Sequence, residues 1–326
     1  TASLPHISFA DICMGCLDQS SLCFQVQNLH TMAESTQDFK ELNKRAWNKE
    51  AVPKFELPEF KALSRLSVFK YLTIGSKGQS VSVSDQQVYS VDGINNSDVE
   101  NKGINAVGNA TVLGNKVNTN IWSIFDKDDT KIREGPLEIL DFACGPGNVT
   151  LALLASLPPE RTYKITGIDL SEDLVNAYNK RVDSPNAHAE ALDVLEENDV
   201  LGDRKFDIVV CTMSLHHIWD LELLCKRIGA HIKKDGWFFA MDFDTQSHFS
   251  EKEAIEKGVA HTTLGPEKIS RLFENAGLSQ IHVETGFEME FSKEQIRKFE
   301  HRKAADSKDK HANCTGMKLC IVAGRR

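Results

Sequence analysis

The stretch LEILDFACGPGNVT, residues 137–150, decides the fold of this chain. Its apolar start predicts a strand over 137–142, and a loop of small residues leads to a helix expected over 148–156. A strand, a tight glycine turn and a helix form the unit that holds a nucleotide-like ligand at the edge of a parallel sheet. Glycine is needed in such a turn because a Cβ atom would keep the ligand away from the backbone N–H groups.

Two further apolar runs end in residues that suit such a ligand. Residues 164–169 predict a second strand that ends in Asp169, and residues 206–211 predict a later strand that leads into His216 and His217. An acid at the end of the second strand accepts hydrogen bonds from ribose hydroxyls. Thr150 stands where a dinucleotide fingerprint has its third glycine, so a pyrophosphate ligand is not favoured.

Strands and helices alternate from residue 137 onward. Strands are expected at 137–142, 164–169, 186–191, 206–211, 236–243, 280–288 and 316–323, and helices at 148–156, 172–181, 220–232 and 266–276. This alternation predicts an α/β fold, a doubly wound and mostly parallel seven-stranded sheet with helices on both faces.

Together these motifs resemble the class I S-adenosylmethionine-dependent methyltransferases, in particular their small-molecule branch, over residues 137–326. The resemblance is carried by DFACGPG (141–147), GIDLS (167–171), ALD (191–193), the run 206–220 and MKLCIVAG (317–324). It implies a Rossmann-like methyltransferase fold whose last strand inserts antiparallel beside the fifth, with S-adenosyl-L-methionine as cofactor. Ala143 departs from the family, which often has its first glycine there, but alanine is small enough to leave binding intact.

The resemblance also implies the cofactor contacts. Asp141 would act near the amino group of the cofactor, Asp169 would hold the ribose hydroxyls, and Asp193 would accept from the adenine amine. For each carboxylate, a surface or capping role is the alternative. The full set of expected contacts is Trp47, Asp141, Ala143, Gly145, Gly147, Asp169, Leu170, Asp193, Val194 and Cys211.

The catalytic residues are less evident, because displacement at a sulfonium methyl mainly needs alignment of the partners and exclusion of water. A general base is needed only when the acceptor carries a proton. His216, His217 and His261 are the candidates, since histidine titrates near neutrality, and a structural role is the alternative for each. Residues 211–214 read CTMS instead of the adenine-methyltransferase tetrapeptide, which argues against methylation of amides or exocyclic amines by that route.

Four segments are expected along the chain. Residues 1–31 lack periodicity and are expected to be a flexible leader, and residues 32–74 a helical cap segment that includes Trp47. Residues 75–133 are polar, with eight asparagines between 95 and 120, which predicts a disordered insertion; a functional lid is the alternative. Residues 134–326 are expected to form the S-adenosylmethionine-binding methyltransferase domain.

Composition excludes some partners. The chain has 326 residues with a net charge of −9, and an acidic protein is a poor candidate for nucleic-acid binding. No apolar run is long enough to span a membrane and no signal peptide is evident, so no membrane insertion is expected. The eight scattered cysteines suit reduced thiols and a cytoplasmic location. Cys13 and Cys16 have no partner pair, so no metal is expected.

The sequence therefore predicts methyl transfer from S-adenosylmethionine to a small-molecule acceptor by a monomer or homodimer. Two alternatives stay open. One is a protein methyltransferase. The other is a cofactor-binding protein without catalysis, which is motivated by the interruption at residues 75–133.

Overall fold

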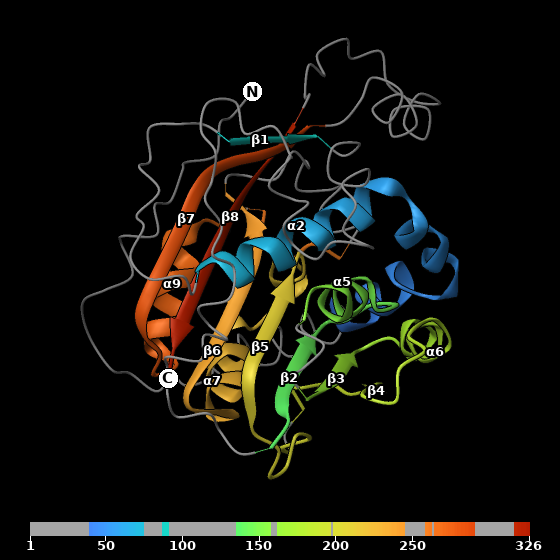
Figure 1. The fold of residues 1–326 in the computed structure, drawn as a ribbon, viewed down its shortest axis with the longest axis horizontal. Coiled ribbons are helices and arrows are strands. Elements are labelled where there is room, and N and C mark those ends of the chain that lie inside the picture. Colours follow the sequence, from blue (N-terminus) through green and yellow to red (C-terminus); the bar gives the residue numbers. More distant parts are fainter. Residues whose placement is uncertain are drawn as a thin grey trace, which may run out of the picture.

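The computed structural model describes residues 39–74, 87–90, 135–157, 162–196, 198–244, 258–262, 264–290 and 316–326. They form one eight-stranded sheet in the order β1-β7-β8-β6-β5-β2-β3-β4 (Figure 1). The strands are β1 (Gln87–Ser90), β2 (Leu137–Phe142), β3 (Tyr163–Asp169), β4 (Ala187–Ala191), β5 (Phe206–Thr212), β6 (Ile232–Phe243), β7 (Ser279–Glu290) and β8 (Gly316–Arg325). The helices are η1 (Lys49–Glu56), α2 (Pro58–Ile74), α5 (Asn148–Ser156), α6 (Glu172–Arg181), η3 (Leu215–His217), α7 (Leu221–Ala230) and α9 (Pro266–Asn275).

The strand directions confirm the predicted fold class. β2 pairs with β3 and β5, β3 pairs with β4, and β5 pairs with β6, all in parallel. β8 lies antiparallel between β6 and β7, so the last strand is reversed beside the fifth predicted strand, as the resemblance implies. All seven predicted strands are present, with ends that differ by a few residues.

The sheet nevertheless has eight strands, one more than the seven predicted. β1 pairs in parallel with β7 at the edge of the sheet. It lies within residues 75–133, which the sequence predicts as disordered, so that prediction is wrong for these four residues. A four-residue strand carries too little periodicity to be recognised, and its hydrogen bonds come from β7, about 200 residues away. The rest of the insertion and the leader 1–31 lie outside the described residues.

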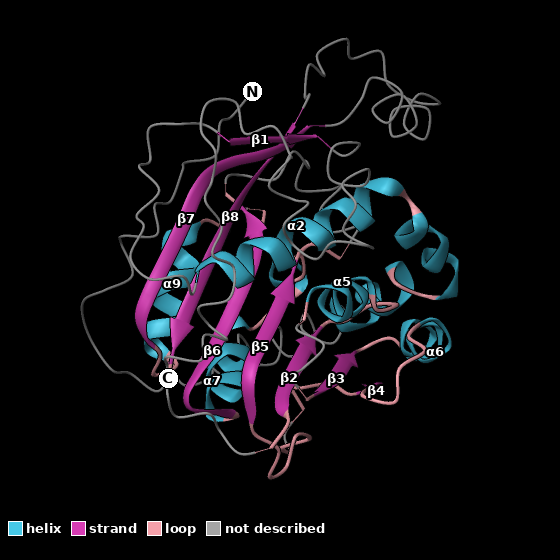
Figure 2. Ribbon diagram, in the orientation of Figure 1, coloured by secondary structure: helices cyan, strands magenta, loops and turns pink. Residues whose placement is uncertain are grey.

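Helices cover both faces of the sheet (Figure 2). Ile208 and Val210 of β5 belong to the core shared with α2 and α5, whereas Val209 and Cys211 belong to the core shared with α7 and α9. Successive strand residues point to opposite faces, so both sides of β5 are buried. A strand buried on both sides reads as an unbroken apolar run, which is why these strands could be recognised in the sequence.

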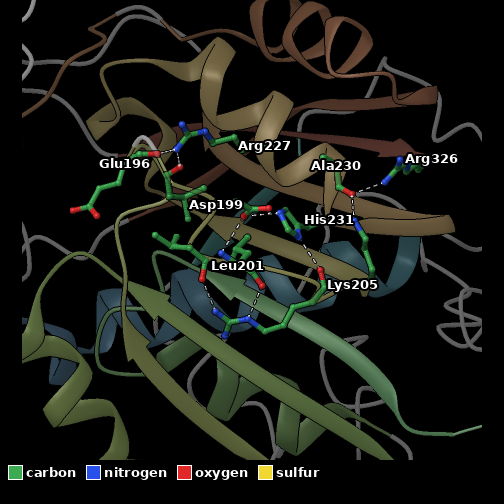
Figure 3. A network of polar contacts seen from close by, with 11 residues as sticks. Glu196, Asp199, Leu201, Lys205, Arg227, Ala230, His231 and Arg326 are labelled. Atoms are coloured by element: carbon green, nitrogen blue, oxygen red, sulfur yellow. Dashed lines mark hydrogen bonds and ion pairs between the residues drawn. The ribbon is translucent and has the colours of Figure 1, made fainter.

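A polar network closes the amino ends of β5 and β6 (Figure 3). His231 contacts the Arg204 carbonyl through Nδ1 at 2.7 Å and Asp199 Oδ1 through Nε2 at 3.0 Å. Arg326 donates to three carbonyls between residues 229 and 232, including that of Ala230. These bonds satisfy carbonyls that the end of α7 leaves without helical partners. Of the predicted site residues, Val194 touches this network, because its carbonyl accepts a hydrogen bond from Arg227 (Figure 3).

Two kinds of feature are absent from the described residues. No helix in the described ranges is long and apolar enough to cross a membrane. Within the same ranges, no group of three or more histidine, cysteine, aspartate or glutamate side chains is arranged to hold a metal ion.

Candidate functional site

The three predicted cofactor carboxylates lie along one edge of the sheet. Asp141 is the second-last residue of β2, Asp169 ends β3, and Asp193 follows β4 by two residues. Because β2, β3 and β4 are parallel neighbours, their carboxyl ends meet at the same edge. This is the edge at which doubly wound folds bind their ligands.

The loop after β2 adopts left-handed backbone at three positions, with φ of 55° at Ala143, 51° at Gly145 and 90° at Gly147. A Cβ at Gly147 would lie 2.9 Å from Cδ2 of Tyr178, so this glycine lets α6 pack against the loop. A Cβ at Gly145 would lie 3.2 Å from Cε1 of Phe55, so this glycine allows the N-terminal segment to approach. Ala143 has the left-handed backbone conformation, which costs an L-residue on the order of 1 kcal/mol.

Asp169 is oriented by backbone donors on two sides. The Gly145 N–H donates to Oδ2 at 2.9 Å, and the Ser171 N–H donates to Oδ1 at 2.9 Å. Burial raises the pKa of Asp169, and these hydrogen bonds oppose that rise. A carboxylate offers about four acceptor positions, so both oxygens keep capacity for ribose hydroxyls.

Asp141 ends a buried chain of hydroxyl groups. Thr150 Oγ1 donates to its Oδ2 at 2.7 Å, and the Tyr178 hydroxyl donates to Thr150 Oγ1 at 2.9 Å. Burial raises the pKa of Asp141 to about 7. A cation bound close to this carboxyl would favour its ionised form.

Asp193 pairs with the N-terminal segment. Lys40 Nζ lies 2.6 Å from Oδ2, and the Leu195 N–H donates to Oδ1 at 2.9 Å. The neighbouring Val194 side chain is buried, and Arg227 donates to the Val194 carbonyl. Asp193 therefore has both a backbone donor and a cation as partners in the structure.

Residues 39–56, here called the cap, lie across this edge. Residues 39–46 are helical, and η1 follows. The cap contacts the chain just beyond four neighbouring strands, and Figure 1 shows it in blue beside α5 and α6. The contacts are Lys40 to Asp193 beyond β4 (2.6 Å), the Lys49 N–H to Asp173 beyond β3 (3.0 Å), Asn148 to the Phe55 carbonyl beyond β2 (2.8 Å), and Asn43 to the His217 carbonyl beyond β5 (3.0 Å).

Two polar atoms of the cap lack partners. The Trp47 ring packs edge-on against His217 at 5.3 Å and tilts against Phe55 at 5.7 Å. Trp47 Nε1 and Asn43 Oδ1 are buried, and neither has a hydrogen-bond partner among the described residues. Buried polar groups are normally hydrogen-bonded. With the three carboxylates, this free donor and free acceptor fit a polar ligand such as S-adenosylmethionine.

His216 forms a buried pair with Asp242, a residue that the sequence analysis missed. The His216 ring places Nδ1 2.8 Å from Asp242 Oδ1, and the two side chains are 6% and 0% exposed. The Phe243 N–H donates to Oδ1 at 2.8 Å, and the His216 N–H donates to Oδ2 at 3.3 Å. The available signal was a single acid near the end of an apolar strand, because Asp242 directly follows the buried residues 238–241 of β6.

The other two histidines lie beside this pair but have other partners. His217 Nδ1 lies 2.9 Å from the Gly258 carbonyl, and burial and the neighbouring His216 lower the pKa of His217 to about 3. His261 Nε2 lies 3.0 Å from the Ile218 carbonyl, and its Nδ1 lies 3.4 Å from Lys268 Nζ. Burial, followed by Lys268, lowers the pKa of His261. The structure thus brings the three predicted histidines together but gives their rings different environments.

Cys211 is placed differently from the expectation. Its side chain is fully buried in the core with α7 and α9, so it offers no surface to a cofactor. The Tyr71 hydroxyl donates to the Cys211 carbonyl at 2.9 Å, and burial raises the pKa of the thiol. β5 runs one residue further than predicted, to Thr212, and the chain turns only at Met213, where φ is 54°. The exposed edge therefore begins after Cys211.

A family model described as "Methyltransferase domain" matches residues 120–290. An uncharacterised methyltransferase of Schizosaccharomyces pombe is 34% identical over 165 residues, which are 46% of this chain and 56% of that protein. A ubiquinone biosynthesis O-methyltransferase of Coxiella burnetii is 25% identical over 138 residues, 41% of this chain and 51% of that protein. The chain spans about half the length of these curated relatives.

Among solved structures, phosphoethanolamine N-methyltransferase 2 of Haemonchus contortus, in complex with S-adenosyl-L-methionine, is similar to this chain. It is 17% identical, with a TM-score of 0.41, and the match covers 59% of this chain and 49% of that one.

Proposed function

We propose that this chain, which belongs to the methyltransferase domain family and is an S-adenosylmethionine-dependent methyltransferase, transfers the methyl group to a small-molecule acceptor. The observation that carries the proposal is the cap, which contacts the chain beyond β2, β3, β4 and β5. A macromolecular acceptor would have to displace these contacts to reach the strand ends, whereas a small molecule enters beneath them. The name of the Coxiella burnetii relative, a ubiquinone biosynthesis O-methyltransferase, supports the same class of acceptor.

The proposal assigns a carboxylate at the strand ends to three polar groups of the cofactor. Asp169 would accept from the ribose hydroxyls, with Leu170 against the adenine, and Asp193 would accept from the adenine amine. Asp141 would face the ammonium group. When bound, the cofactor supplies an electrophilic methyl group on a sulfonium. The residues of the chain then need only to orient the acceptor, exclude water and manage the acceptor's proton.

Calorimetry with S-adenosylmethionine, its demethylated product and NAD tests the cofactor assignment. The first two are expected to bind and NAD is not, because the glycine loop lacks the third glycine of a dinucleotide site. Asp169→Ala should weaken binding. Asp207→Asn, at the amino end of β5, serves as the control, because Asp207 is buried but pairs with Lys233 far from the loop.

Labelled methyl transfer then tests the acceptor class. The full chain is incubated with methyl-labelled cofactor and, in separate reactions, with a metabolite extract and a protein extract. Label in a metabolite supports the proposal. Label only in protein would identify a protein methyltransferase, and cofactor binding without any transfer would identify a binding protein without catalysis.

A further inference from the structure

We propose that His216, held in place by Asp242, is the base that takes the proton from a hydroxyl acceptor, so that the enzyme methylates oxygen. His216 is the catalytic residue in this scheme and Asp242 is a positioning residue. The inference rests on the proposed function, and it specifies the atom of the acceptor that attacks.

The hydrogen bonds of the pair select one form of the His216 ring. Asp242 accepts from the His216 ring at 2.8 Å and from the backbone N–H groups of His216 and Phe243. A carboxylate acceptor at Nδ1 places the ring proton on that nitrogen. No described residue hydrogen-bonds Nε2, which keeps its lone pair. This is the arrangement of an oriented general base.

The two neighbouring histidines are poorer candidates for the base, each for its own reason. His217 is a weak base, because burial and His216 lower its pKa to about 3. His261 has no nitrogen to offer, because one faces the Ile218 carbonyl at 3.0 Å and the other faces the ammonium of Lys268 at 3.4 Å. Of the three histidines at this edge, His216 alone has a carboxylate partner at one ring nitrogen and no described partner at the other.

The pair lies next to the cofactor residues along the sheet edge. His216 follows β5 and Asp242 ends β6, while the cofactor carboxylates belong to β2, β3 and β4, and the order of these strands is β6-β5-β2-β3-β4. A row of rings joins the two parts. From the glycine loop it runs through Phe55, Trp47, His217, His216 and Phe243, with centroid separations of 5.7, 5.3, 4.2 and 4.9 Å. An acceptor beside this row would lie between the methyl donor and the base.

The surroundings of the pair hold mostly neutral groups at pH 7. Burial lowers the pKa of His217 and His261 and raises the pKa of the Cys211 and Cys320 thiols, all of which interact electrostatically with Asp242. Asp244, which also interacts electrostatically with Cys320, has a pKa that burial raises. Asp242, whose Oδ1 lies 2.8 Å from Nδ1 of His216, is the carboxyl that faces the ring.

The proposed step conserves atoms, electrons and charge. The acceptor oxygen bonds to the methyl carbon, and the carbon–sulfur bond breaks with its electron pair going to sulfur. The hydroxyl proton passes to Nε2 of His216 and afterwards to solvent. The products are a methyl ether or ester, the demethylated thioether and one proton, and no oxidant or reductant is required.

The state of the ring can be measured without turnover. In ¹⁵N-resolved NMR of the full chain, the His216 signals are identified by their loss in His216→Asn. We expect a proton on Nδ1 and none on Nε2 at alkaline pH, with Nε2 gaining a proton as the pH falls. In Asp242→Asn the other tautomer should become populated. A wild-type ring protonated on Nε2 but not on Nδ1 at alkaline pH would overturn the proposal.

Kinetics on the labelled metabolite test the role of the pair. Asp242→Asn should lower kcat by roughly 10²–10⁴, the range for general-base catalysis, with KM and cofactor affinity unchanged. The pH profile of kcat/KM should also change, because Asp242→Asn removes the carboxylate that faces Nδ1 of His216. Asp242→Glu should recover part of the rate. Asp207→Asn, a buried carboxylate at the other end of the sheet, should keep the wild-type profile.

The outcomes separate this inference from the proposed function. A product methylated on nitrogen or sulfur would overturn the inference and leave small-molecule transfer intact, as would an unaltered rate and pH profile in Asp242→Asn. If no metabolite is labelled, the proposed function fails, and the NMR titration still decides whether His216 offers a free nitrogen. If Asp242→Asn does not bind the cofactor, His216→Asn replaces it, because the asparagine amide can keep the hydrogen bond to Asp242 while Nε2 is lost.

Discussion

The described residues include two histidine–aspartate pairs, one at each end of the same two strands. His216 follows the carboxyl end of β5, and Asp242 is the second-last residue of β6. His231 and Asp199 lie before the amino ends of these strands (Figure 3). The nitrogen–oxygen distances are similar, 2.8 and 3.0 Å. Asp242 is completely buried, however, whereas the Asp199 side chain is 62% exposed.

The second ring nitrogen accounts for the functional difference between the pairs. His231 has an acceptor at each nitrogen, the Arg204 carbonyl at Nδ1 and Asp199 at Nε2, so neither nitrogen can receive a proton from a ligand. His216 has a hydrogen-bond partner among the described residues at Nδ1 but not at Nε2. A histidine–aspartate pair is therefore a candidate base only when the other nitrogen is free, and the same two residue types otherwise tie a loop to the sheet.

The largest expected effect compares the two histidines directly. His216→Asn should lower turnover by roughly 10²–10⁴, because it deletes the free nitrogen and can keep the bond to Asp242. His231→Asn should leave turnover per folded molecule unchanged. Both are measured by labelled methyl transfer, with calorimetric cofactor binding as the control for folding. Equal losses of turnover in the two variants would break the comparison.

A second prediction separates cofactor binding from proton transfer. Asp169→Ala should weaken cofactor binding by on the order of 1.5–3 kcal/mol, the range for hydrogen bonds to charged groups. His216→Asn should leave the dissociation constant unchanged, because its ring bonds Asp242 and no cofactor carboxylate. Calorimetry on the two variants provides the measurement. Wild-type affinity in Asp169→Ala would show that the ribose is held elsewhere.

A third prediction concerns the structural role of the amino-end pair. His231→Leu removes the donor to the part-buried Arg204 carbonyl and should lower the free energy of unfolding by roughly 1–3 kcal/mol, the cost of leaving a polar group without its partner. Urea unfolding followed by circular dichroism gives the value. Lys205→Ala, which removes an exposed hydrogen bond to the Ala230 carbonyl, is the matched control and should cost less.

The smallest effect is the pH dependence of the Asp199 contact. Desolvation opposes ionisation of Asp199, but the charge of His231 and the hydrogen bonds to the carboxyl together give a net lowering of the Asp199 pKa. A carboxyl whose pKa is lower in the folded state stabilises the fold at pH values above its unfolded-state pKa of about 4. This contribution is lost as the pH falls through the folded-state pKa. The difference in Tm between wild type and Asp199→Asn should therefore shrink from pH 6 towards pH 3, at about constant ionic strength. A constant difference would mean that the pair has no ionic contribution.

Much of the fold followed from local patterns in the chain. β2, β3 and β5 are buried on both faces, so their apolar runs are continuous and their ends are marked by Asp169, by the glycine loop and by His216. A parallel arrangement then places the strand ends at one edge, and the positions of Asp141, Asp169 and Asp193 at that edge were predictable. β1 was not predictable, because four residues hold no recognisable period and pair with a distant strand.

The sequence by itself determined the sheet, the glycine loop and the set of carboxylates and histidines at its edge, because each of these depends on residues close together in the chain. Only the tertiary structure decided how they are used. It paired His216 with Asp242 across 26 residues, gave both nitrogens of His261 to other groups, and laid Lys40 of the cap on Asp193, 153 residues away in the numbering (193 − 40). Hydrogen bonds and burial depend on distances in space, and those distances are set only when the strands and the cap have packed together.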